Sequence, residues 1–165
     1  MAMKMDRRAF LKTSAAMAVA VSMTGLLGGC SDSDIGTDLG GFTVAVGKWS
    51  AVPHDQGIGT GKSWYADFTV TVCVHNMDSV NGFSFPAKSV FVLKINGQKV
   101  VLQGGDLLSN ITLVMKKGER RTGILTFRLD ESQKNLYQAM EAQTADIKLT
   151  VGVDPTETYT GVYEG

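Results

Sequence analysis

One stretch of the chain alternates between apolar and polar residues for longer than any other. It covers residues 64–76 and reads WYADFTVTVCVHN. Every second residue is apolar (Trp64, Ala66, Phe68, Val70, Val72, Val74), and the residues between them are mostly polar (Tyr65, Asp67, Thr69, Thr71, Cys73, His75). Successive side chains on a strand point to opposite faces, so this pattern predicts one long β-strand with a dry face and a wetter face. We expect it to be the central strand of the fold.

Shorter segments repeat this alternation on either side of the central strand. Apolar positions alternate in residues 42–46, 83–86, 89–95, 98–102, 107–115, 122–129, 146–153 and 159–163. Trp49 and Val52 extend the first of these strands until Pro53 stops it. Asn96-Gly97 is a strong signal for a type I′ hairpin turn. The spacing predicts an all-β fold, an immunoglobulin-like antiparallel β-sandwich.

One segment departs from the period of two. Within Asp130–Gln143, the residues Leu136, Tyr137 and Met140 fall at helical spacing, and Asp130 or Ser132 can cap the start of a helix. This segment predicts a single short helix.

The N-terminus has the charged and apolar regions of an export signal. Basic residues precede an apolar run from Ala15 to Leu27, which is too short to span a membrane comfortably. The start resembles twin-arginine signals through Arg7, Arg8, Phe10, Leu11 and Lys12, with Asp6 where Ser or Thr is usual. An ordinary secretory signal with two arginines is the alternative.

Cys30 follows the apolar run directly, and the segment Leu27-Gly28-Gly29-Cys30 resembles a bacterial lipobox. The resemblance implies that Cys30 receives lipid and becomes the new N-terminus, and two or more acyl chains make a stable membrane anchor. We therefore divide the chain into a signal peptide (residues 1–29), a lipidated cysteine with a flexible tether (30–41) and one domain (42–165). The protein is expected to be exported and anchored to the outer face of the cytoplasmic membrane.

Charge argues against a nucleic-acid partner. The first 29 residues hold four of the 16 basic residues and one of the 16 acidic ones, so the remainder carries 12 basic against 15 acidic residues. A slightly acidic domain lacks the basic face that nucleic acids require. The basic run from Lys116 to Arg121 could contact an anionic lipid or polymer, but a solvated hairpin tip explains it more simply.

A nucleotide site is not expected either. Gly61-Lys62-Ser63 matches the end of a phosphate-binding loop, but Gln56 occupies the position of its first glycine. A strand rather than a helix follows, so no helix N-terminus is available for the phosphates. We interpret residues 57–63 as a glycine loop between strands.

The residues that could bind a metal are few. Cys73, His75 and Met77 alternate on one face of the central strand, and His54 lies upstream. Blue-copper sites use two histidines and a cysteine with a weak methionine ligand, although on wider spacing than Cys-x-His-x-Met. A small copper-type protein using these four residues is therefore the alternative function, and a small packed residue is the simpler interpretation of Cys73.

The order of the segments resembles immunoglobulin-like domains of unknown function that many secreted lipoproteins of Gram-positive bacteria carry. The resembling parts are Phe42–Val46, Phe68–Asn76 followed by Phe83-Ser84, the Asn96-Gly97 hairpin, and Lys117-Gly118-Glu119 running into Thr122–Phe127. The resemblance implies a fold and a location, and no catalytic residues.

Taken together, we expect a membrane-anchored, non-catalytic binding module that contacts an unidentified envelope protein or polymer. No constellation for catalysis stands out in the sequence, and we expect no cofactor.

Overall fold

The computed structural model describes residues 37–54 and 64–161. The predicted export signal, Cys30 and the glycine loop at residues 57–63 lie outside these ranges. Strands occupy most of the described chain: β1 (Thr37–Asp38), β2 (Phe42–His54), β3 (Tyr65–Asn76), β4 (Phe83–Pro86), β5 (Phe91–Ile95), β6 (Gln98–Gly104), β7 (Thr112–Met115), β8 (Arg120–Leu129), β9 (Ile147–Val151) and β10 (Glu157–Gly161). The helical segments are the single turn α3 (Ala87–Val90), the 3-10 turn η1 (Glu131–Gln133) and the helix α4 (Lys134–Glu141). The prediction of a β fold with one short helix is confirmed.

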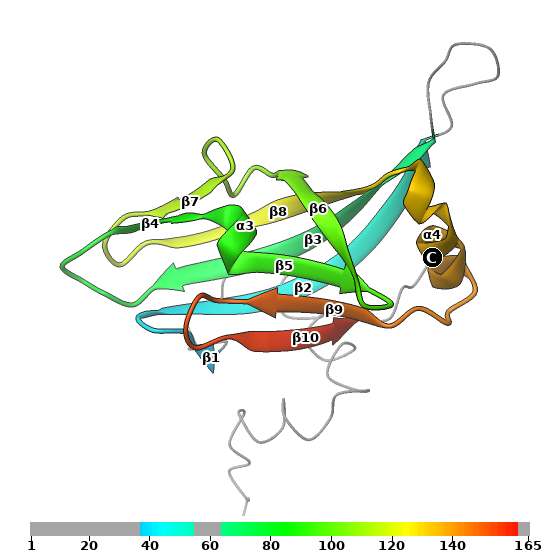
Figure 1. Cartoon of the computed structure of the whole chain (residues 1–165). Coiled ribbons are helices and arrows are strands. Elements are labelled where there is room, and N and C mark those ends of the chain that lie inside the picture. Colours follow the sequence, from blue (N-terminus) through cyan, green and yellow to red (C-terminus); the bar gives the residue numbers. More distant parts are fainter. Residues whose placement is uncertain (1–36, 55–63, 162–165) are drawn as a thin grey trace, which may run out of the picture.

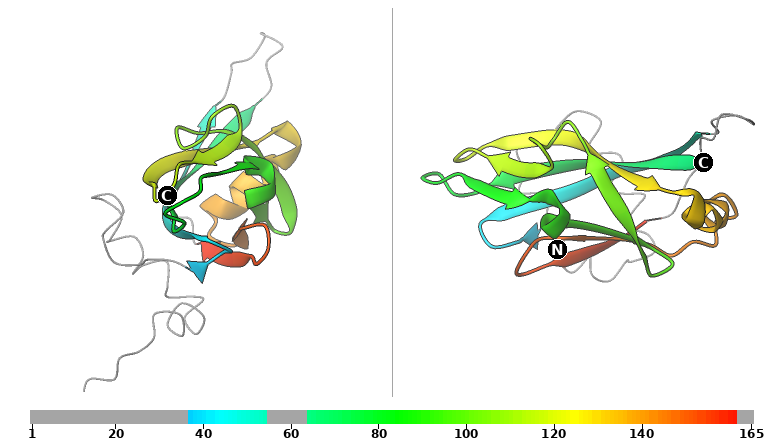
Figure 2. Two further views of the ribbon diagram at one scale, coloured as in Figure 1. Left: turned by 90° about the vertical axis from the view of Figure 1, so that its left-hand side faces the viewer. Right: turned by 45° about the horizontal axis from the view of Figure 1, so that its top comes forward.

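Eight of the strands form one antiparallel sheet in the order β1-β2-β3-β8-β6-β5-β9-β10, and β4 pairs with β7 as a separate ribbon. Because β6 pairs with both β8 and β5, the hydrogen bonding runs through a single sheet. The sheet curls into a half-barrel whose last strands approach the first ones (Figures 1 and 2). The Tyr159 hydroxyl on β10 donates to the carbonyl of Val44 on β2 over 2.9 Å and joins the two sides of the curl. Burial raises the pKa of Tyr159 above its ordinary value, so this hydroxyl stays protonated.

The long strand predicted at residues 64–76 is β3, and it lies between β2 and β8 in the middle of the longest part of the sheet. Its dry face is the core: Ala66, Phe68, Val70, Val72 and Val74 are all 0% exposed. The alternation in the sequence therefore assigned the two faces of β3 correctly.

Helix α4 closes one end of the curled sheet (Figure 1). Asp130 caps the preceding turn by accepting from the backbone of Ser132, and Gln133 returns a bond to the Asp130 backbone. Leu136, Tyr137 and Met140 are buried, as their helical spacing predicts. The ring of Tyr137 packs edge-on against Trp64 at 5.6 Å, which ties the helix to the start of β3.

Three boundaries differ from those expected from the sequence. β2 continues through Pro53 to His54, because β1 pairs only with Thr43 and Val44, and no other described strand pairs with that side of β2 at Pro53. The predicted strand at residues 107–115 is reduced to β7, because Asn110 and Ile111 have φ angles of 47° and 58° and turn the chain. Within the expected tether, residues Thr37–Asp38 form β1, and Leu39 is buried.

No helix in residues 37–54 and 64–161 is long and apolar enough to cross a membrane.

Candidate functional site

An aromatic and charged cluster lies on the outer face of the sheet, at the end that α4 closes. It consists of His54 from β2, Tyr65 and Asp67 from β3, and Arg128 from β8. The strand register makes His54 the partner of Tyr65 and Arg128 the partner of Asp67. Side chains two residues apart on a strand share a face, so this pairing gathers four polar side chains from three strands.

The four side chains contact one another closely. Arg128 donates from Nε and Nη2 to the two carboxylate oxygens of Asp67, over 2.9 and 3.2 Å. His54 Nε2 lies 3.4 Å from Asp67 Oδ2 and forms an ion pair with it when the imidazole is protonated. The His54 ring stacks on Tyr65 at 4.6 Å, and the Arg128 guanidinium lies 4.2 Å from the centre of the same ring. The cluster therefore holds the tyrosine ring between neighbours from two flanking strands.

Charged contacts connect the side chains of this cluster, which stay partly exposed to solvent. The hydrogen bonds to Asp67 raise the pKa of Arg128, so the guanidinium stays charged. The side chains of His54, Asp67 and Arg128 are 38%, 21% and 39% exposed, and solvent at such sites limits each ion pair to about 1 kcal/mol or less. The cluster thus offers a fixed aromatic ring and a charged guanidinium to solvent. Tyrosine and arginine are the side chains enriched at binding hot spots.

The four residues of the metal hypothesis are not brought together. His54 is level with Tyr65, whereas His75 lies ten residues further along β3, roughly 30 Å away at about 3.3 Å per residue. Cys73 and His75 do share a face of β3, and Met77 follows the strand and is exposed. Within residues 37–54 and 64–161, no group of three or more His, Cys, Asp and Glu side chains could hold a metal ion.

Cys73 is buried on β3. The interpretation of Cys73 as a small packed residue accounts for this burial. Cys30, the other of the two cysteines in the sequence, lies outside the described residues.

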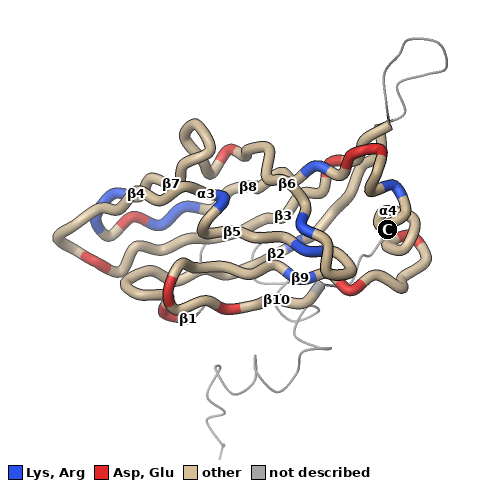
Figure 3. The backbone as a smooth tube through the Cα atoms, viewed as in Figure 1, with Lys and Arg blue, Asp and Glu red and all other residues tan. Residues whose placement is uncertain are grey.

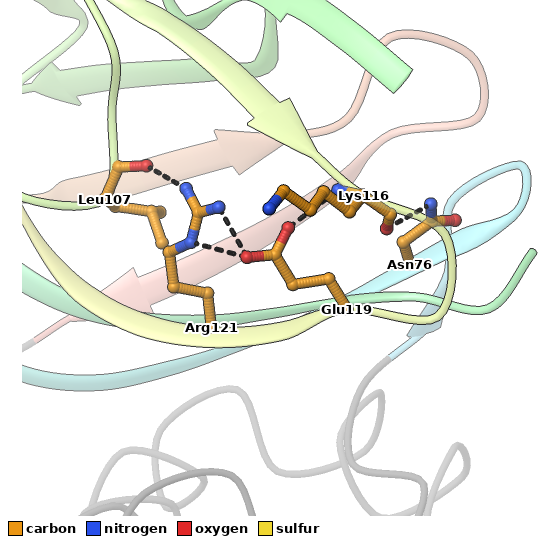
Figure 4. A network of polar contacts seen from close by, with 5 residues as sticks. All are labelled: Asn76, Leu107, Lys116, Glu119 and Arg121. Carbon is orange, nitrogen blue, oxygen red and sulfur yellow. Dashed lines mark hydrogen bonds and ion pairs between the residues drawn. The ribbon is translucent and has the colours of Figure 1, made fainter. Parts of the chain in front are cut away.

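The basic run at residues 116–121 forms the hairpin tip between β7 and β8, where Glu119 forms an ion pair with Arg121 (Figure 4). One Glu119 oxygen accepts from the Lys116 backbone at 2.6 Å, and the other accepts from Nε and Nη2 of Arg121. Arg121 also donates to the carbonyl of Leu107 over 3.2 Å. Lys116 and Lys117 are exposed at this solvated hairpin tip. Contact of the run with an anionic lipid or polymer stays a prediction.

Buried Asn76 anchors the same tip from the end of β3. Its amide nitrogen donates to the carbonyls of Asn81 and Lys116, both at 2.9 Å, and its amide oxygen accepts from the backbone of Asp78. The side chain is 1% exposed. One amide thus holds together the loop after β3 and the hairpin before β8.

We expect low pH to reduce the stability of the protein, because protonation of Glu119 weakens the contacts of the hairpin tip. The hydrogen bond from Lys116 and those from Arg121 lower the pKa of Glu119. A lowered folded-state pKa contributes stability above the unfolded-state value, and this stability is lost as the pH falls through the folded-state value. We expect Glu119→Gln to be less stable than the unchanged protein at pH 7, and the difference to disappear as the pH falls below about 4. Urea unfolding of both proteins across this range measures it, and a constant difference would contradict the expectation.

Comparisons with known proteins place the chain by fold. No protein-family model matches it, and no curated protein matches its sequence. The crystal structure of a functionally unknown protein from Listeria monocytogenes is similar, with a TM-score of 0.54 at 14% identity over 78% of this chain and 81% of that protein. A "putative lipoprotein (ycdA)" from Bacillus subtilis is similar, with a TM-score of 0.51 at 11% identity over 82% of this chain. This chain spans 40% of the length of the Bacillus protein. At these identities the likeness concerns the fold alone.

Proposed function

We propose that the chain is an exported lipoprotein, anchored to the outer face of the cytoplasmic membrane through Cys30, whose immunoglobulin-like domain is a non-catalytic binding module of the cell envelope. The N-terminal pattern of Arg7, Arg8 and Cys30 supports export and anchoring. The fold that the chain shares with a "putative lipoprotein" of Bacillus subtilis is consistent with this location.

The cluster around Tyr65 is the observation that carries the binding role. Its ring is held by His54 and Arg128, while both of these neighbours stay more than a third exposed. A side chain fixed before binding loses little conformational freedom when a partner arrives. We assign the partner contact to this cluster.

Anchoring is tested with the full chain expressed in a bacterium that has twin-arginine export and lipoprotein processing. An alkyne-labelled fatty acid should be incorporated into the unchanged protein and should be absent from Cys30→Ala. Replacing Arg7 and Arg8 by lysine should leave the chain in the cytoplasm and unlabelled. Labelling that persists in Cys30→Ala would overturn the assignment of the anchor.

The binding role is tested in the full chain carrying Cys30→Ala, which removes the proposed lipid anchor, by replacing Tyr65 and measuring co-sedimentation with cell envelopes of the source organism. Tyr65→Ala should weaken binding by about 30-fold, the cost of truncating a hot-spot aromatic residue. Tyr65→Phe keeps the ring and should retain most of the binding. Thr71→Ala, on the same face of β3, is the matched control and should leave binding unchanged. Equal binding by the Tyr65→Ala and Thr71→Ala variants would contradict the assignment.

A further inference from the structure

Three lysines form a row across the outer face of the sheet, next to the Tyr65 cluster. Lys94 on β5 is the direct partner of Lys99 on β6 and of Lys148 on β9. All three side chains are exposed. Neighbouring strands lie about 4.8 Å apart, so the three backbone positions span roughly 10 Å in a line perpendicular to the strands. Basic positions on β6, β5 and β9 indeed lie side by side near the β5–β6 hairpin (Figure 3).

The row is not explained by the stability of the sheet. Like charges directly opposite one another on neighbouring strands destabilise a sheet. Lysine on an edge strand can prevent aggregation, but β6, β5 and β9 are all interior strands. Lys148 pairs with Asp146 at 2.8 Å, whereas Lys94 and Lys99 form no ion pair with any residue that the structure describes. Two of the three positive charges are therefore open to a partner.

Asp67 on β3 and Asp130 after β8 are each already engaged. Asp67 binds Arg128, and Asp130 caps the turn before α4. Arg128 is the direct partner of Val101, which lies two residues from Lys99 on the same face of β6. The three lysines and Arg128 therefore form one continuous basic band, in which Asp146 pairs with Lys148 and Asp67 pairs with Arg128.

We propose that this band binds a linear polyanion, a polymer with closely spaced phosphate or carboxylate groups, with Lys99, Lys94 and Lys148 as the principal contacts. The regular spacing of the charges in a line fits a chain of repeating anions better than a single small ion. Exposed lysines also attract such a polymer over about 8–10 Å at moderate salt. The inference names a partner class for the binding role proposed above, on which it rests.

The test measures binding of medium-chain inorganic polyphosphate to the purified full chain in non-ionic detergent, by fluorescence anisotropy at low and at physiological salt. The unchanged protein should bind, and binding should weaken as salt increases. Replacing Lys94, Lys99 and Lys148 together by glutamine should weaken binding at least tenfold, because each lysine near a dense array of negative charges contributes roughly a factor of five. Asp146→Asn should strengthen binding, because it releases Lys148.

The matched control replaces Lys48, Lys88 and Lys117 by glutamine, which removes the same charge from exposed positions outside the row. The affinity of this variant for polyphosphate should fall less than twofold. The row variant should be at least as stable to heat as the unchanged protein, because it relieves repulsion, so a loss of binding does not report unfolding.

Equal losses in both triple variants, or binding to vesicles of anionic phospholipid without binding to polyphosphate, would overturn the proposal. Fatty-acid labelling at Cys30 and envelope binding through Tyr65 do not depend on this result. A result that overturns the polyanion proposal can therefore be distinguished from one that overturns the proposed function.

Discussion

Replacing Phe68 with alanine is expected to lower the free energy of unfolding by about 3–5 kcal/mol. Phe68 is 0% exposed in the middle of β3, with Ala51 and Phe127 as its partners on the flanking strands. Its ring also packs edge-on against Trp49 at 5.7 Å. Alanine at this position removes apolar contacts and leaves a cavity that two paired strands cannot close, because their backbones are fixed by hydrogen bonds.

Urea unfolding of the full chain, followed by tryptophan fluorescence, measures this loss. Thr69→Ala is the control, since Thr69 is the next residue on β3 and its side chain lies on the opposite, half-buried face. It should cost less than about 1 kcal/mol. A loss below about 1.5 kcal/mol for Phe68→Ala would mean that β3 is not the centre of the core.

Asn76→Ala should destabilise the protein by about 2–4 kcal/mol, although it removes a polar side chain. Asn76 satisfies the carbonyls of Asn81 and Lys116 and the backbone N–H of Asp78. Alanine leaves these groups without their partner in a site that is 1% exposed, and unsatisfied buried polar groups are costly. The hairpin tip and the loop after β3 should then separate.

Two measurements check this expectation. Thermal unfolding gives the loss of stability, with Asn135→Ala as the matched control, because Asn135 is exposed on α4 and alanine favours helices there. Hydrogen exchange should show faster exchange in residues 76–82 and 116–120, and unchanged exchange in β5 and β9. Uniform acceleration across the sheet would instead indicate global unfolding.

The alternation of apolar residues was sufficient to predict most of the fold. Phe68, Val70 and Val72 alternate strictly, so the sequence assigned the core face of β3 and its central place. The Asn96-Gly97 turn is also as predicted, with φ angles of 49° and 78°. The boundaries in residues 107–115 were not predictable, because Ile111 is a β-branched residue that rarely adopts a positive φ. Its conformation depends on the surrounding loop and not on its own propensity.

The candidate site was only partly visible in the sequence. Tyr65 and Asp67 could be assigned to the outer face, since they alternate with the core residues of β3. Arg128 and His54 join them only through the register of β3 with β8 and β2, which depends on all the contacts of the sheet. The same limitation applies to the lysine row, because Lys99 and Lys148 are far apart in the sequence. Only the pairing of Lys94 with Lys99 followed from the sequence, because the Asn96-Gly97 hairpin places them opposite each other.

The hydrogen bond from Tyr159 to Val44 connects β10, the last described strand, to β2. This hydrogen bond across the curl forms only when β10 is in place, because Tyr159 supplies its donor. Contacts between segments so distant in the sequence form slowly. A chain that ends before β10 would leave β9 as an edge strand. The unpaired backbone groups of β9 could then pair with a strand of another molecule. The contact that joins the two sides of the curl is therefore made by the last strand that the structure describes.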